Sequence, residues 1–134
     1  MLAHIVGSKR AEAWRWWESR RLRYNIGLAM AGWIACGAFW AILFAYSDDS
    51  AAYDIVLVAK VTLAMGVGFL VIMVAANVCY LLGVVAELVF KPEDLETFRG
   101  RAWDLGYWGS LALPFLLPLI TLVLTVLYGQ TRYD

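Results

Sequence analysis

The stretch VTLAMGVGFLVIMVAANVCYLLGVVAELVF, from Val61 to Phe90, decides the fold of this chain. It is almost uniformly apolar, and its only charged residue, Glu87, lies near its end. A run this long is typical of a transmembrane helix. Two shorter helices, Val61–Val74 and Cys79–Phe90, would be only about 21 and 18 Å long, whereas the hydrocarbon layer is about 30 Å thick. We therefore expect one long, tilted helix over residues 55–90.

Two further apolar runs flank this stretch, at residues 26–46 and 107–128. Hydrophobic residues make up 63% of the 134-residue chain and charged residues only 16%, and a soluble core of this size would not bury three such runs. The net charge of zero gives no general affinity for nucleic acid. The sequence predicts an all-α, three-span transmembrane protein with a single domain over residues 1–134.

The charges outside the runs predict the orientation. Residues 1–25 carry six lysines and arginines against two glutamates, whereas residues 47–54 carry three aspartates and no basic residue. Short basic segments remain in the cytoplasm, so we expect a cytoplasmic N-terminus and a periplasmic C-terminus. The first run follows a long basic segment, which is typical of a retained signal anchor and not of a cleaved signal peptide. For the three aspartates a solvated turn is favoured over cation capture.

The basic segment at residues 1–25 interleaves tryptophan with arginine. Such residues suit the headgroup layer of a membrane, which predicts an interfacial helix on the cytoplasmic surface. The candidates for contact with lipid headgroups are Trp16, Trp17, Arg20, Arg21 and Arg23. A nucleic-acid-binding arm is the disfavoured alternative.

Residues 91–106 form the second polar segment. Pro92 suits the first turn of a helix, acidic residues follow it, and Gly100 is placed to end the helix. We expect a short cytoplasmic helix here, between the second and third spans.

Three polar or ionisable side chains lie within the second span. Asn77 falls near its middle, where it needs a hydrogen-bond partner on another helix; a ligand for a substrate or ion is the alternative. Lys60 and Glu87 would lie at opposite rims, Lys60 reaching toward Asp54 and Glu87 toward Lys91. A proton or cation site at Glu87 is the functional alternative.

Small residues recur at four-residue steps in the first two spans, which allows helices to approach closely. Packing within the chain and contact between copies of the chain both fit this pattern. The positions are Gly27, Ala31 and Ala35, then Gly37 and Ala41, and in the second span Ala75, Cys79 and Gly83.

The third span contains Pro114 and Pro118, which predict kinks. Thr121 and Thr125 are placed to return hydrogen bonds to their own backbone. A purely structural bent span is favoured over a broken helix that lines a transport site.

No catalytic constellation is evident. The only histidine, His4, lies outside the spans, and Cys36 and Cys79 are isolated in apolar runs. We therefore predict no enzymatic activity and no metal site, and the sequence indicates no particular cofactor.

Two segments, WWESRRLRYNIGLAMAG (Trp16–Gly32) and ANVCYLLGVVAEL (Ala76–Leu88), resemble small bacterial multi-span inner-membrane proteins with no assigned activity. The resemblance implies a bacterial inner membrane and brings no function with it.

The favoured function is a non-catalytic membrane subunit, either a homo-oligomer or an accessory component of a larger membrane complex in contact with lipids. A small oligomeric channel or transporter that uses Glu87 and Asn77 is the alternative. The third hypothesis is a membrane enzyme or a lipid-handling protein that reads anionic headgroups through Arg20, Arg21 and Arg23.

Overall fold

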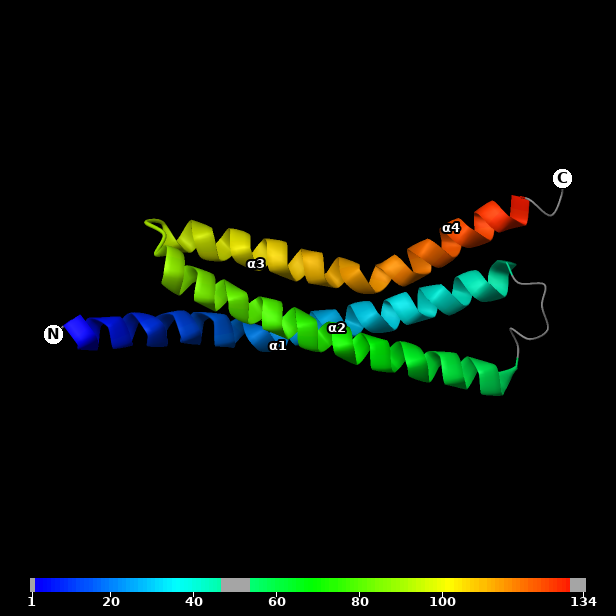
Figure 1. The fold of residues 1–134 in the computed structure, drawn as a ribbon, viewed down its shortest axis with the longest axis horizontal. Helices are drawn as coiled ribbons and strands as arrows, with labels where there is room; N and C mark the ends of the chain where they lie inside the picture. Colours follow the sequence, from blue (N-terminus) through cyan, green and yellow to red (C-terminus); the bar gives the residue numbers. More distant parts are fainter. Residues whose placement is uncertain (1, 47–53, 131–134) are drawn as a thin grey trace.

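The computed structural model describes residues 2–46 and 54–130, and all its regular elements are helices. They are α1 (Leu2–Tyr46), α2 (Ile55–Phe90), α3 (Leu95–Ala112), the 3₁₀ turn η2 (Leu113–Phe115) and α4 (Leu116–Gln130). They form three long rods, because α3, η2 and α4 follow one another without a loop (Figure 1). The prediction of an all-α chain with three helices long and apolar enough to cross a membrane is confirmed.

Helix α1 is continuous, which corrects the prediction of a separate interfacial helix in residues 1–25. One stripe of buried residues runs through both its polar and its apolar part at steps of three, four or seven residues, so a single helix face packs from Ala13 to Ala35. The stripe consists of Ala13, Trp17, Tyr24, Leu28, Ala31 and Ala35.

The predicted short cytoplasmic helix in residues 91–106 is likewise not a separate element. Helix α2 ends where Lys91 adopts the left-handed conformation, with φ 44°, and α3 begins after Asp94, whose carboxylate accepts a hydrogen bond from the Thr97 amide at 3.1 Å. Gly100 does not end the helix, because a glycine in a helix interior costs only about 1 kcal/mol and the flanking residues pack on α1 and α2.

The third rod bends where the sequence contains its first intramembrane proline. Pro114 lies within η2 and is buried, and the chain changes direction there (Figure 1). Pro118 lies within α4 and is buried as well. Thr121 and Thr125 donate to the carbonyls of Leu117 and Thr121 at 2.9 and 2.7 Å, as expected.

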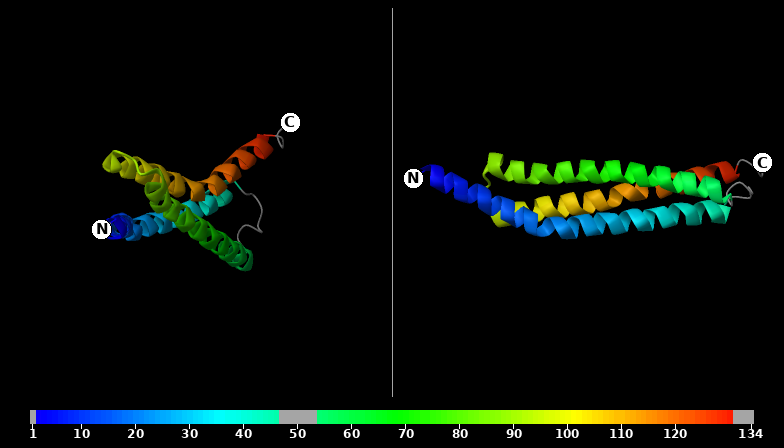
Figure 2. Two further views of the ribbon diagram at one scale, coloured as in Figure 1. Left: turned by 60° about the vertical axis from the view of Figure 1, so that its left-hand side comes forward. Right: turned by 90° about the horizontal axis from the view of Figure 1, so that it is seen from below.

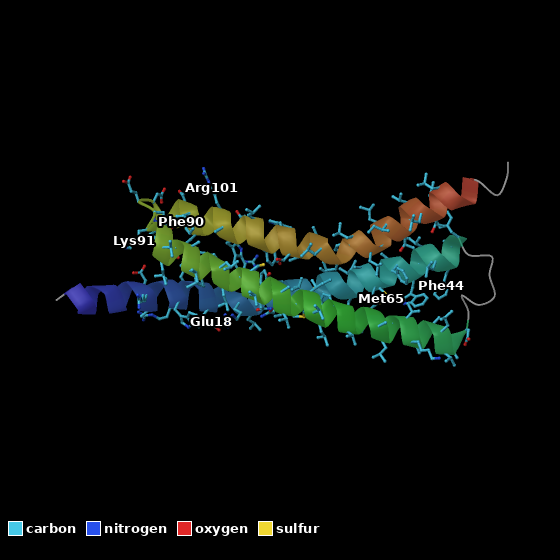
Figure 3. All side chains as sticks on the ribbon, viewed as in Figure 1. Glu18, Phe44, Met65, Phe90, Lys91 and Arg101 are labelled. Carbon is cyan, nitrogen blue, oxygen red and sulfur yellow. The ribbon has the colours of Figure 1, made fainter. Side chains whose placement is uncertain are left out.

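The three rods divide into two halves at a level defined by contacts between the helices. Asn25 of α1 bonds Asn77 of α2, and Tyr24 of α1 bonds Ser110 of α3. On one side of this level lies the apolar half, residues 25–46, 55–77 and 107–127, in which Lys60 is the only charged residue. On the other side lies the charged half, residues 10–24 and 78–106. Figure 3 shows Phe44 and Met65 in the apolar half and Glu18, Lys91 and Arg101 in the charged half.

The apolar half has the thickness of a membrane. Its three segments contain 21 to 23 residues each, which corresponds to about 31–35 Å of helix, and the hydrocarbon layer is about 30 Å thick. The predicted place of Asn77 near mid-bilayer stays a prediction, and a layer that covers only the apolar half would place Asn77 at its edge instead. The remaining turns of α2, out to Phe90, extend about 20 Å further.

The helices are not parallel along their whole length. Two further views show α2 crossing the other rods and diverging from α4 toward the end where α4 terminates (Figure 2). Of the charged residues in segments 10–46 and 55–127, all except Lys60 belong to the charged half.

Candidate functional site

The centre of the charged half is a buried ion pair between α2 and α3. Glu87 and Arg99 are only 5% and 8% exposed. Arg99 Nε donates to Glu87 Oε2 at 2.9 Å and Arg99 Nη2 donates to Glu87 Oε1 at 2.5 Å. This two-point contact matches the planar guanidinium to the planar carboxylate, which is the strongest geometry for such a pair.

Helix α1 completes the site. Trp17 is 3% exposed, and its indole Nε1 donates to Glu87 Oε2 at 3.0 Å. Glu12 lies 3.6 Å from Arg99 Nη1, and its own side chain is largely exposed. The guanidinium carbon of Arg99 also lies 5.4 Å from the centre of the Trp16 ring. Both charges therefore have partners on α1, and the site ties the three helices together.

The turn between α2 and α3 brings Glu87 and Arg99 together. Lys91 in the left-handed conformation and Asp94 at the start of α3 reverse the chain within four residues. Arg99 then lies one helical turn into α3, opposite Glu87 in the last turn of α2. The predicted partner of Glu87 was Lys91, but Lys91 caps the helix through its backbone amide, which donates to the Glu87 carbonyl at 3.2 Å.

A cluster of aromatic rings lies next to the ion pair and extends to the edge of the apolar half. The Tyr80 hydroxyl donates to the Trp17 carbonyl, and the Tyr24 hydroxyl bonds the Ala76 carbonyl at 3.2 Å and Ser110 Oγ at 2.7 Å. Neighbouring rings are 4.9 to 6.3 Å apart, in tilted, edge-on or stacked contacts. The cluster comprises Trp17, Tyr24, Tyr80, Trp103 and Tyr107.

The residues predicted to contact lipid headgroups have mixed positions. Trp17 is buried against Glu87, which corrects its predicted role, and Trp16 packs edge-on against it. Arg20 stacks 3.7 Å above Trp16 and bonds the Trp16 carbonyl, while Arg21 pairs with Glu18 at 3.3 Å. Arg23 is exposed. These five residues belong mainly to the helix interfaces and the surface of the charged half.

The other polar residues predicted in the second span are far from the ion pair. Asn77 Nδ2 donates to Asn25 Oδ1 and to the Met73 carbonyl, both at 2.9 Å, so its partner is on another helix. Lys60 is exposed near the opposite end of α2. Asp54, the expected partner of Lys60, caps α2 by accepting from the Val56 amide at 2.9 Å. Asp48 and Asp49 lie outside the described residues.

The small residues separate into packed and unpacked positions. Ala31 and Ala35 are buried. Gly27 faces Tyr107 and Gly83 faces Trp17, so closely that a Cβ atom would lie 2.5 Å from the Tyr107 hydroxyl oxygen and 2.7 Å from the Trp17 ring, respectively. Four other predicted packing positions are exposed, although one of them, Cys79, lines the small cavity of the aromatic cluster. These are Gly37, Ala41, Ala75 and Cys79.

Two cavities differ in size and lining. The aromatic cluster encloses only about 60 Å³. In the apolar half, a groove of about 710 Å³ lies between α1, α2 and α4, lined almost entirely by apolar residues such as Phe69 and Ile120. Across residues 2–46 and 54–130, no group of three or more histidine, cysteine or acidic side chains is placed to hold a metal ion.

Sequence reasoning missed Arg99, Tyr24 and Tyr80 as members of the site. The available signal for Tyr24 was the spacing of the aromatic residues in α1, because Trp17 and Tyr24 are seven residues apart and therefore lie on the same helix face. Arg99 had no such signal, since Lys91, Arg99 and Arg101 all follow Glu87 within 14 residues. Only the geometry of the turn selects one of them.

Comparison with protein-family models, with curated proteins and with solved structures found no match. The functional interpretation therefore depends on the geometry of this chain.

Proposed function

We propose that this chain is a non-catalytic integral membrane subunit, which acts by packing against other membrane protein chains. The observation that carries the proposal is the outward face of α2 in the charged half. Leu82, Val85, Val89 and Phe90 are each more than half exposed there. At the same level α1 and α3 expose charged residues such as Arg15 and Asp104 together with single apolar residues such as Leu22 and Leu105.

A contiguous exposed apolar face marks a contact surface for protein or for a membrane. We place the edge of the hydrocarbon layer near the Asn25–Asn77 hydrogen bond, and in that placement these residues lie beyond the lipid. We therefore propose protein as their cover. A subunit of a membrane complex would supply it.

The ion pair favours this function over a channel or transporter. A transported proton or cation needs a carboxylate that exchanges partners. Glu87 instead accepts three hydrogen bonds, two from Arg99 and one from Trp17, and the neighbouring cavity is only about 60 Å³. Glu87 and Asn77 are thus better suited to hold the helices in register.

We further propose a bacterial inner membrane as the location, with the charged half on the cytoplasmic side. Support comes from the five arginines between Arg10 and Arg23, since short basic segments remain in the cytoplasm.

The experiment that tests the subunit proposal is a mass measurement. The chain, extracted from its own membrane in a mild detergent, should migrate in a protein assembly larger than a 15.0 kDa monomer, as measured by light scattering with the detergent contribution subtracted. A monomer under the mildest conditions that extract it would contradict the proposal. Ion flux through liposomes should be the same for the natural chain and for Glu87→Gln, and a decrease in the variant would favour the channel.

A further inference from the structure

One face of α1 runs along α2 through both halves of the molecule. The guanidinium carbon of Arg21 lies 5.8 Å from the centre of the Tyr80 ring, and Asn25 accepts a hydrogen bond from Asn77 at 2.9 Å. Further along, Gly32 packs against a phenylalanine ring of α2. The residues of this face are three, four or seven positions apart, so they lie on one side of the helix. We call them the α1–α2 seam, which comprises Glu18, Arg21, Asn25, Gly32 and Cys36.

In the apolar half the seam opens into the groove of about 710 Å³, where Gly32 and Cys36 face Gly66 of α2. A Cβ atom at Gly66 would meet nothing within 4 Å, so this part of the groove is not filled by the chain itself. Trp33 and Leu70 also line the groove and are 77% and 61% exposed, so bulky side chains project at its mouth. Helices approach one another closely where residues are small, and a helix is about 10–12 Å wide. A groove with a narrow floor and a bulky mouth therefore suits a single hydrocarbon chain better than a second helix.

In the charged half the seam has polar groups with donors to spare. Arg21 pairs with Glu18 through Nη1 at 3.3 Å, and its Nε is buried with no hydrogen-bond partner. The two side chains are 31% and 46% exposed, and exposed ion pairs are weak, so both groups are able to take new partners. Arginine binds phosphate by two parallel hydrogen bonds. Between the ion pair and the groove, Asn25 Nδ2 donates to no residue of segments 2–46 and 54–130.

The order and the spacing of these groups match one phospholipid in one leaflet. Along the helix, Asn25 is about 6 Å from Arg21 and about 16 Å from Cys36. A headgroup layer is about 5–8 Å thick on each side of a bilayer, and half of the hydrocarbon layer is about 15 Å. In a zwitterionic phospholipid the phosphate lies next to the glycerol and the ammonium lies further out. Arg21 and Glu18, one turn further out, are thus complementary in charge to such a headgroup.

We propose that the α1–α2 seam binds one zwitterionic phospholipid. Arg21 binds its phosphate, Glu18 its ammonium group and Asn25 an ester carbonyl, while one acyl chain lies in the groove. The bound chain supplies the contacts that the lining of an empty groove would lack. This inference uses the membrane placement proposed above and is independent of the subunit role.

Lipid retention by the purified chain tests the site. The chain is reconstituted in vesicles with equal amounts of phosphatidylethanolamine, which is zwitterionic, and phosphatidylglycerol, which is anionic. It is then extracted in a mild detergent and washed, and the retained lipid is identified by native mass spectrometry. A single phosphatidylethanolamine should remain on each chain. Loss of all lipid, or preferential retention of phosphatidylglycerol, would overturn the proposal.

A matched pair of variants on α2 tests the position of the acyl chain. Gly66→Leu fills the groove and should lower the lipid retained several-fold. Ala64→Leu adds the same bulk at an exposed position two residues away, outside the groove, and should leave retention unchanged. Equal retention in the two variants would overturn the placement of the chain in the groove.

A second pair on α1 tests the headgroup. Arg21→Gln should lower retention several-fold, whereas Arg23→Gln, at an exposed position on another face of the helix, should not. Glu18→Gln should reduce the preference for phosphatidylethanolamine over phosphatidylglycerol. Equal retention in Arg21→Gln and Arg23→Gln would overturn the assignment of the phosphate to Arg21.

The mass measurement distinguishes this inference from the proposed function. A large assembly that retains no lipid would refute the lipid site and leave the subunit role intact. A monomer that retains the lipid would refute the subunit role and leave the lipid site intact.

Discussion

The charged and apolar halves of the molecule hold their helices together by different means. In the charged half, directional contacts link all three helices around Glu87, Arg99 and Trp17, and the enclosed cavity is about 60 Å³. In the apolar half, side-chain bonds between helices are sparse, for example from Trp40 Nε1 to Thr62 Oγ1 at 3.0 Å, and a groove of about 710 Å³ separates the helices.

The proposed placement of the membrane gives a physical reason for this difference. Water favours burial of apolar surface, whereas hydrocarbon gives apolar side chains no reason to leave it. In that placement the charged half, outside the hydrocarbon, sets the register of the helices, and the apolar half depends on small residues and on neighbours. Variants in the two halves should consequently have unequal effects.

The largest loss of stability should follow removal of Arg99. Arg99→Ala leaves the Glu87 carboxylate buried without its guanidinium, which costs about 3–5 kcal/mol in other proteins. Thermal unfolding in detergent, followed by tryptophan fluorescence, measures the effect. Arg101→Ala, at an exposed position two residues away, should change little. The paired variant Glu87→Met with Arg99→Met should recover most of the loss, because an apolar pair carries no unpaired charge. Equal melting temperatures for Arg99→Ala and Arg101→Ala would contradict a stabilising role of the ion pair.

The next largest loss of stability should follow a substitution at Gly83, and Gly68 of the same helix provides the control. A Cβ at Gly83 would lie 2.7 Å from the Trp17 ring, whereas a Cβ at Gly68, in the apolar half, meets nothing within 4 Å. Gly83→Ala should destabilise by about 1–3 kcal/mol through overpacking. Gly68→Ala should be neutral or slightly stabilising, because alanine is the better helix former. The same unfolding assay compares the two variants. A larger loss of stability in Gly68→Ala than in Gly83→Ala would contradict the close packing of Gly83 against Trp17.

A smaller effect is expected at the boundary. Asn77→Leu removes the hydrogen bond to Asn25. Interhelical bonds of this kind contribute about 0.6 to 1.7 kcal/mol in membrane proteins. A double-mutant cycle with Asn25→Leu isolates the pair energy in the same assay. Additive losses would mean that the two amides do not interact.

The smallest effect concerns the turn. The hydrogen bonds that Thr97 donates to Asp94 hold the pKa of that carboxyl below its ordinary value of 3.8. Because the folded pKa is lowered, the contribution of Asp94 to stability is complete above the ordinary pKa and is lost as the pH falls through the lowered one. The Thr97 amide chemical shift, followed into acidic solution, should report this loss. In Asp94→Asn, which caps without titrating, the shift should stay constant over the same range.

The sequence predicts the helices better than their partners. The three apolar runs, the bend at Pro114 and the bonds returned by Thr121 and Thr125 all follow from local composition and spacing. The sequence analysis did not predict that α1 is one continuous helix, because six basic residues in its first part suggested a separate surface helix. The spacing of the buried residues from Ala13 to Ala35 is the better guide to that helix.

The ion pair and the membrane edge depend on information that the sequence does not contain locally. Which cation meets Glu87 is set by the backbone of the turn at Lys91. The partner of Asn77 is Asn25, 52 residues earlier in the chain. Neither contact follows from the pattern of any single helix.

The central claim is that the membrane covers α2 from Ile55 to about Asn77 and leaves its last turns outside. A nitroxide scan over exposed positions, such as Leu63, Val67, Leu70, Val74, Val78 and Leu82, measures depth as the ratio of oxygen to water-soluble nickel accessibility in reconstituted vesicles. We expect the greatest depth near Val67, midway between Ile55 and Asn77, with a fall to interfacial values by Val78. A maximum near Val74, the midpoint of a helix that crosses from Lys60 to Glu87, would contradict this placement of the membrane.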